Sequence, residues 1–158
     1  MVRIFDRKLK KETIKNYVLQ SFFAAFVLYL GLNLPILGDE IVLVAAAGST
    51  AFIVFALPNS ETAHPRRVIG SHFVCGLIGL AFHTTYPSIL SFELAVSLAL
   101  GVAILTMVSL WLEHPPAGGT VLFFVVNPQP IALVSLLLLV SIMTTLSYVA
   151  RPYLYDLL

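Results

Sequence analysis

Charged residues are scarce in this chain, and their scarcity decides its broad class. Only 11% of the 158 residues are Asp, Glu, Lys or Arg, 59% are hydrophobic, and the mean hydropathy is +0.96. A soluble domain carries about 25% charged residues, because its surface must face water. An ordinary soluble domain is therefore excluded, and with a net charge of only +1 we expect no nucleic-acid partner. The missing charge predicts a surface in contact with the lipid bilayer.

Cysteine and catalytic motifs are nearly absent as well. Cys75 is the only cysteine, so the chain cannot form an internal disulfide or a cysteine-rich metal site. The histidines lack a metal-ligand spacing such as H-E-x-x-H, and no nucleophile–base motif is present. We therefore expect no metal, no cofactor and no catalytic residue, and we expect that the protein is not an enzyme.

Long uncharged runs are abundant and predict the membrane spans. A helix needs about 20 apolar residues to cross the hydrocarbon core. The first run is closed by Asp39 and Glu40, and the third is expected to end near Pro87. The predicted spans are residues 16–38, 41–60, 68–92, 94–112 and 131–149.

A sixth apolar segment is too short to span. Residues 117–126 lie between Pro115-Pro116 and the run Asn127-Pro128-Gln129-Pro130, and their ten residues make a helix of roughly 15 Å. The segment is predicted to be a half-helix, either re-entrant or lying at the surface. The expected fold is thus all-α, a polytopic transmembrane helical bundle with about five spans plus this half-helix after the His-Pro-Pro turn.

Basic residues predict the orientation. Six of the nine lie within the first fifteen positions, and cytoplasmic loops of membrane proteins are rich in Lys and Arg. Arg66 and Arg67 fall on the same side after two crossings. We expect a multi-pass protein of the cell inner membrane with a cytoplasmic N-terminus. Its parts are a basic segment at 1–15, a transmembrane domain at 16–150 and a short tail at 151–158.

Two His-Pro steps follow spans two and four, at His64-Pro65 and His114-Pro115. Proline suits the first position of a helix, and the free N–H groups of a helix start bind anions. Broken helices survive in lipid only where they line a cavity or are shielded by protein. These turns are therefore predicted as anion sites, and the alternative is that each is a tight cytoplasmic connector.

Polar side chains within the spans are the other candidates. His72, Gly76, Gly79 and His83 share one helical face and could line a pore. The alternative is that the histidines bond to neighbouring carbonyls and the glycines permit close helix packing. The hydroxyls of Ser49 and Thr50 could meet an ion, although close packing is the simpler interpretation of their Ala- and Gly-rich surroundings.

Several motifs together resemble the HPP family of integral membrane proteins. The run His114-Pro115-Pro116-Ala117-Gly118-Gly119-Thr120 is similar to the family signature, and four upstream segments occur in the family's order: residues 48–51, 58–60, 64–66 and 69–72. The resemblance covers about residues 40–150. It departs from the family pattern "QPRNVIGGH" with His64 for Gln, Arg67 for Asn and Ser71 for Gly.

Members of this family from plant plastids are implicated in nitrite transport, so the resemblance implies a channel or transporter for a small monovalent anion. A structural or regulatory membrane subunit whose HPP turn docks a partner is the alternative. We expect a homo-oligomer, because five spans are few to enclose a polar path. The candidate substrate-binding or pore residues are Ser49, Thr50, His64, Arg66, Arg67, His72, His114, Pro115, Pro116, Gly118, Gly119 and Thr120.

Overall fold

The computed structural model describes residues 11–33 and 41–157, which fold into helices and connections without any strand. The predicted all-α class is therefore confirmed. The helices are α1 (Lys11–Leu32), α2 (Ile41–Ala56), η1 (Glu61–Ala63), α3 (Pro65–Ile89), α4 (Phe92–Ser109), α5 (Ala117–Val126), α6 (Pro130–Ala150) and η2 (Arg151–Tyr153).

Four of these helices are long and apolar enough to cross a membrane: 14–32 in α1, 65–86 in α3, 92–109 in α4 and 130–153 from α6 into η2. The second predicted span is shorter than expected, since α2 has 16 residues and ends at Ala56. The half-helix α5 has the predicted bounds. Residues 1–10 and 34–40, with the end of the first predicted span and Asp39-Glu40, lie outside the described part.

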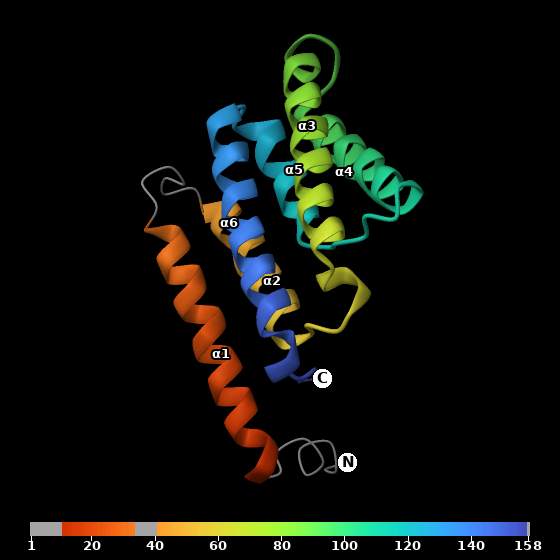
Figure 1. Cartoon of the computed structure of the whole chain (residues 1–158). Coiled ribbons are helices and arrows are strands. Elements are labelled where there is room, and N and C mark those ends of the chain that lie inside the picture. The colour runs from red at the N-terminus through yellow and green to blue at the C-terminus, as the bar shows by residue number, and fades with distance from the viewer. Residues whose placement is uncertain (1–10, 34–40, 158) are drawn as a thin grey trace, which may run out of the picture.

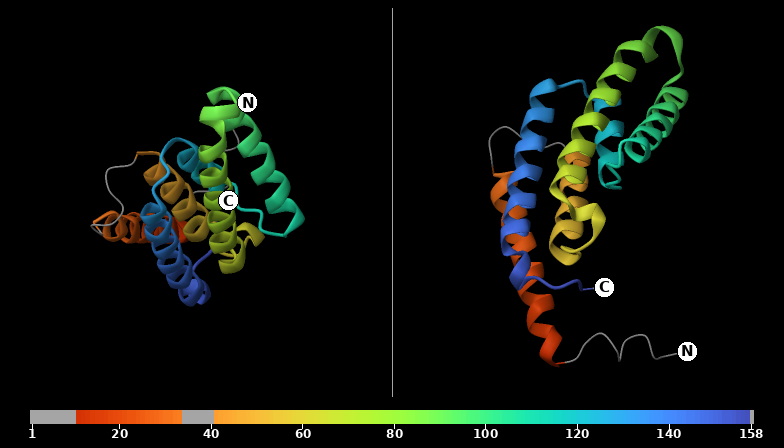
Figure 2. Two further views of the ribbon diagram at one scale, coloured as in Figure 1. Left: turned by 90° about the horizontal axis from the view of Figure 1, so that it is seen from above. Right: turned by 45° about the vertical axis from the view of Figure 1, so that its right-hand side comes forward.

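Helices α2, α3, α5 and α6 form the centre of the bundle (Figure 1). Helix α5 packs most extensively against α3 and also contacts α2 and α4. Helix α1 lies along α2, and its first turns extend beyond the other helices (Figure 2). Helix α4 folds back along α3 and leans away from the centre, so the short α5 is enclosed between longer helices.

The short helix α5 is buried although it does not span. Thr120, Val121, Phe123, Phe124 and Val125 are all less than 2% exposed. One side contributes to a core with α2, α3 and α6, and the other meets an alanine stripe of α4. The enclosing helices therefore shield most of its side chains from lipid, as a half-helix in a membrane requires, and only its last residue, Val126, is exposed.

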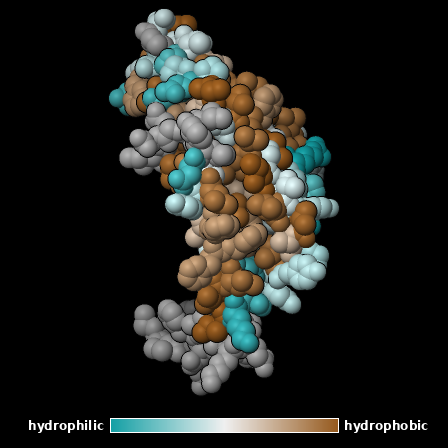
Figure 3. All heavy atoms as spheres, turned by 60° about the vertical axis from the view of Figure 1, so that its left-hand side comes forward, coloured by the Kyte–Doolittle hydropathy of each residue, from teal (hydrophilic) through white to brown (hydrophobic). Residues whose placement is uncertain are grey.

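Apolar side chains cover the outside of the bundle. In Figure 3 a broad apolar area lies between hydrophilic groups at the ends and edges of the view. Helix α1 exposes Phe22 and Phe26, and α4 exposes Leu98 and Leu105. Such faces cost free energy in water and none in hydrocarbon. The surface therefore fits the membrane environment that the composition predicts.

The end of α4 aims the next segment inward. Trp111 has a left-handed φ of 57°. The N–H of Leu112 donates to the carbonyl of Met107, and the N–H of Trp111 donates to that of Val108, which is a Schellman ending. Leu112 is thereby buried, and the chain turns into the bundle. This turn delivers His114 to the interior.

Candidate functional site

Four polar side chains form one buried cluster where α2, α3 and α5 meet. The hydroxyl oxygen of Thr50 lies 2.9 Å from Nε2 of His72 and 3.0 Å from Nε2 of His114. On the far side of His72, Nδ1 lies 2.7 Å from the hydroxyl of Thr120. All four side chains are fully buried. The sequence singled out each of these residues, and the structure brings them into contact.

One backbone carbonyl fixes the direction of every hydrogen bond in this cluster. Nδ1 of His114 lies 2.8 Å from the carbonyl oxygen of Thr62, which only accepts, so Nδ1–H donates. Burial lowers the pKa of His114 from 6.5 to about 4, against a smaller rise from the Thr62 bond, so the ring is neutral and Nε2 accepts. The hydroxyl of Thr50 must then donate its hydrogen to His114.

The directions of the remaining hydrogen bonds in the cluster follow by elimination. The hydrogen of Thr50 is committed to His114, so its oxygen accepts from Nε2–H of His72. A neutral His72, the form that an apolar interior favours, then accepts at Nδ1 from the hydroxyl of Thr120. The bonds run Thr120 to His72 to Thr50 to His114 to the Thr62 carbonyl. We call these four side chains the His-Thr chain.

The amides at the start of α5 are not free. The N–H groups of Ala117, Gly118 and Gly119 donate to the carbonyls three residues earlier, at 3.0, 3.0 and 3.1 Å. These bonds form because Pro115 and Pro116 turn the chain tightly just before α5. The prediction that bare N–H groups near Gly118 and Gly119 bind an anion is therefore wrong. The turn serves to place His114.

The backbone N–H groups after the first His-Pro step are also hydrogen-bonded. Nδ1 of the exposed His64 accepts from the N–H of Arg66, and the carbonyl of His64 accepts from the N–H groups of Arg67 and Val68. His64 therefore caps α3, and Pro65 occupies its first turn. The structure places this residue outside the His-Thr chain.

The two arginines differ in their surroundings. Arg66 is exposed, whereas the side chain of Arg67 is 18% exposed and its guanidinium lies between two carboxylates. Its Nη1 lies 2.9 Å from Oε2 of Glu113, and its Nη2 contacts Glu61. The pairing with Glu113, which immediately precedes His114, was not predicted. The positive charge of Arg67 is therefore balanced by carboxylates, whereas Arg66 forms no ion pair within the described ranges 11–33 and 41–157.

Ser49 faces away from the cluster. It is exposed, and its hydroxyl donates to the carbonyl of Ala45 one turn earlier. On α3, Nδ1 of His83 donates to the carbonyl of Val125 near the end of α5. A Cβ added to Gly79 would lie 2.6 Å from the Val121 carbonyl oxygen. Gly79 thus permits close packing of α3 on α5, and of the predicted face only His72 joins the polar cluster.

An apolar hollow of ≈ 280 Å³ reaches His114 from the side of α4. It is lined by Leu100, Ile104, Met107, Val108, Glu113, His114, Pro115 and Gly118. Through this hollow the His114 end of the chain approaches the surface, with Glu113 at its rim. At the opposite end Thr120 is fully buried. The hollow therefore comes closest to the cluster at its His114 end.

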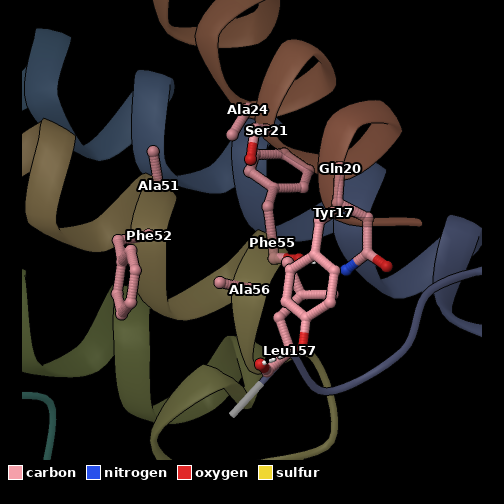
Figure 4. A pocket seen from close by; sticks show the side chains of 9 residues that line it. All are labelled: Tyr17, Gln20, Ser21, Ala24, Ala51, Phe52, Phe55, Ala56 and Leu157. Atoms are coloured by element: carbon pink, nitrogen blue, oxygen red, sulfur yellow. Dashed lines mark hydrogen bonds between the residues drawn. The ribbon is translucent and has the colours of Figure 1, made fainter. Parts of the chain in front are cut away.

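A second cavity, of ≈ 230 Å³, lies between α1, α2 and the C-terminal tail (Figure 4). Buried Gln20 holds this region together: its amide nitrogen donates to the carbonyls of Phe55 and Tyr155, and its oxygen accepts from the N–H of Tyr155. Gln20 was not predicted, although an uncharged polar residue within an apolar span was a signal for it. Its bonds anchor the tail and leave no donor for a ligand.

Comparison with known proteins agrees with this architecture. The sequence matches the family described as "HPP, transmembrane region" over residues 10–154. It is 32% identical over 90 residues to one transmembrane protein of Dictyostelium discoideum and 29% identical over 114 residues to another. These alignments cover 56% and 70% of this chain, but only 31% and 36% of the relatives, so the chain spans about a third of their length. No solved structure matches. The match over nearly the whole chain shows that this protein belongs to the HPP transmembrane family.

Proposed function

We propose that this protein transports a small monovalent anion across the cell inner membrane, with nitrite as the first candidate and the His-Thr chain as the selective element. The observation that carries the proposal is the burial of two histidines and two threonines in contact with each other inside an apolar bundle. Ionisable residues within membrane bundles are costly, and they typically mark ion paths and proton relays.

The chemistry of the cluster suits an anion better than a cation. Its side chains supply imidazole N–H and hydroxyl donors, and none of the four carries a carboxylate. An anion that enters between His72 and His114 would replace the hydroxyl of Thr50 as their common partner. The resemblance to plastid relatives makes nitrite the substrate to test first, and the orientation we propose places the N-terminus and the Glu113 rim on the cytoplasmic side.

Flux measurements on purified protein in liposomes test this function. We expect nitrite uptake above that of empty vesicles, and we expect His72→Asn to reduce it at least tenfold. His83→Asn is the matched control, because His83 lies on the same helix but outside the His-Thr chain, where it bonds to the Val125 carbonyl and packs on Tyr86. If nitrite, nitrate and formate all enter no faster than into empty vesicles between pH 5 and 8, the proposal is wrong.

The second candidate function is a docking subunit, and one observation favours it. Pro115 is exposed beside the buried Pro116, and both border a shallow hollow with Ser49, Phe52 and Ile53. Under this function, Pro115→Ala would release a partner protein during purification from the native membrane. A docking subunit would also show no anion flux in the liposome experiment, even without any substitution.

A further inference from the structure

The His-Thr chain has a property beyond the binding of an anion: its hydrogen bonds all point the same way. Each of the four side chains donates one hydrogen toward Thr62 and, except for Thr120 at the start, accepts one from the preceding member. The heavy-atom distances of 2.7 to 3.0 Å are those of well-formed hydrogen bonds. Such an ordered row needs no rearrangement before a proton moves along it.

We propose that the His-Thr chain is a proton relay, which carries protons from the α3–α5 contact at Thr120 to the rim at Glu113. The relay rests on the proposed transport function in that it supplies the coupling ion. With the orientation proposed above, the His114 end of the row faces the cytoplasm, and an inward proton gradient would carry anion and proton in together.

The transfer balances bond by bond. A proton binds the oxygen of Thr120, whose own hydrogen passes to Nδ1 of His72. The hydrogen on Nε2 of His72 passes to Thr50, and that of Thr50 passes to Nε2 of His114. The hydrogen on Nδ1 of His114 then leaves to a water molecule that enters the hollow beside Glu113 and takes the place of the Thr62 carbonyl as its acceptor. One proton enters and one leaves, and no other reactant is needed.

The hydrogen atoms of the His-Thr chain must return to their starting positions after each transfer. Passage of a proton leaves His114 with hydrogen on Nε2 and a bare Nδ1 facing the Thr62 carbonyl, which is an unfavourable contact between two acceptors. Rotation of the hydroxyls and a return of His114 to the Nδ1–H form restore the row. The Thr62 carbonyl thus sets the resting polarity of the row, and the proton gradient across the membrane sets the direction of net flux.

The surroundings of the row are suited to this role. At its outer end the charged groups are Glu113, Arg67 and Glu61, which bind one another. Across α2, α5 and α6 the single titratable side chain is Tyr148, near the end of α6. No competing proton acceptor therefore interrupts the row within these helices. At the inner end Thr120 is buried in the α3–α5 contact, where Gly79 lets the two helices approach closely.

Proton flux into liposomes, followed with an entrapped pH-sensitive dye, tests the relay. A pH gradient is imposed across vesicles that contain the full chain, with valinomycin and potassium to clamp the voltage, in the absence and in the presence of nitrite. Nitrite entry is measured separately by chemical analysis of the vesicle contents. We expect protein-dependent proton flux in at least one of the two conditions.

Substitutions at Thr50 separate the relay from a packing role. Thr50→Val keeps the shape and removes the hydroxyl, and we expect it to lower proton flux at least tenfold. Thr50→Ser restores the hydroxyl and should raise the flux at least fivefold above that of Thr50→Val. The matched control on the same helix is Ser49→Ala, which should conduct like the unsubstituted protein, because Ser49 bonds only to its own helix.

Each outcome decides the matter. The relay is overturned if Thr50→Val conducts protons like the unsubstituted protein, or if Thr50→Ser conducts no better than Thr50→Val. Nitrite entry without protein-dependent proton flux overturns the relay and leaves the transport function standing. Proton flux without nitrite entry does the reverse, and absence of both overturns both. Should Thr50→Val fail to fold, Thr120→Val and Thr120→Ser provide the same comparison.

Discussion

Nδ1 of His114 lies 2.8 Å from the carbonyl oxygen of Thr62, 52 residues earlier in the chain. This contact ties the turn before α5 to the turn before α3, and it determines which nitrogen of each histidine carries hydrogen. The first prediction follows directly: His114 is the Nδ1–H tautomer and His72 is the Nε2–H tautomer. Nitrogen NMR of histidine-labelled protein in detergent at pH 7.5 reports both. Equal populations of the two tautomers at His114 would contradict the assignment.

Removal of the shared hydroxyl should destabilise the fold. In Thr50→Val, Nε2–H of His72 loses its acceptor and Nε2 of His114 loses its donor, and a buried unsatisfied group costs roughly 1–3 kcal/mol. We expect a loss of about 2 kcal/mol or more in the free energy of unfolding, measured by denaturant titration in detergent. The exposed Ser49→Ala should change it by less than about 0.5 kcal/mol. Equal effects of the two substitutions would show that Thr50 is not the bridge.

The sequence could supply the candidates for this cluster but not their contacts. Hydropathy located the four long helices among the described residues but overestimated the length of α2, and the prolines on both sides of residues 117–126 gave the half-helix its bounds. Ser49 and Thr50 were equivalent in sequence, yet one residue is about 100° of helix rotation, and that angle puts one hydroxyl inside and the other outside. Only the packing of α2 against α5 decides between them.

The hydrogen bonds made by backbone groups could not be predicted from the sequence for a similar reason. Whether the amides after Pro116 are free depends on the tightness of the turn, and the i to i−3 bonds that close it are a property of backbone angles. The carbonyl of Thr62 carries no side-chain signature at all. The pairing of Glu113 with Arg67 across 46 residues follows from helix arrangement alone.

The two carboxylates around Arg67 should contribute unequally to stability. The side chain of Glu61 is 82% exposed and that of Glu113 is 33% exposed, so solvent screens the Glu61 pair far more. We expect Glu113→Gln to lower the free energy of unfolding by about 1 kcal/mol and Glu61→Gln by less than half of that. Denaturant titrations at 50 mM and 500 mM salt measure both. A larger effect at Glu61 would mean that the Glu113 pair is not the buried one.

Acid should destabilise the protein through His114. Its pKa is lowered from 6.5 to about 4 on folding, so below pH 6.5 the unfolded chain binds a proton that the folded chain refuses. Stability from this group is constant above pH 6.5, falls as the pH drops toward 4, and changes little below that. The loss is about 3 kcal/mol, from 1.36 kcal/mol per pH unit.

Thermal unfolding in detergent at pH 7.5, 6.0 and 4.5 measures this loss. The comparison is with His114→Asn, which is expected to be less stable at pH 7.5 because it lacks the ring, and to lose less on acidification. A steeper acid loss in His114→Asn than in the unsubstituted protein would contradict the sign of the effect.

Two glycines in neighbouring helices should respond to alanine in opposite directions. At Gly79 a Cβ would lie 2.6 Å from the Val121 carbonyl oxygen and 2.7 Å from Cβ of Phe124, so Gly79→Ala must push α3 away from α5 and should cost about 2 kcal/mol. At Gly101 in α4 nothing lies within 4 Å, so Gly101→Ala meets no obstacle and should gain up to about 1 kcal/mol from helix propensity. Denaturant titrations of both variants in one detergent provide the comparison. If both alanines are tolerated equally, the close contact of α3 with α5 at Gly79 does not exist.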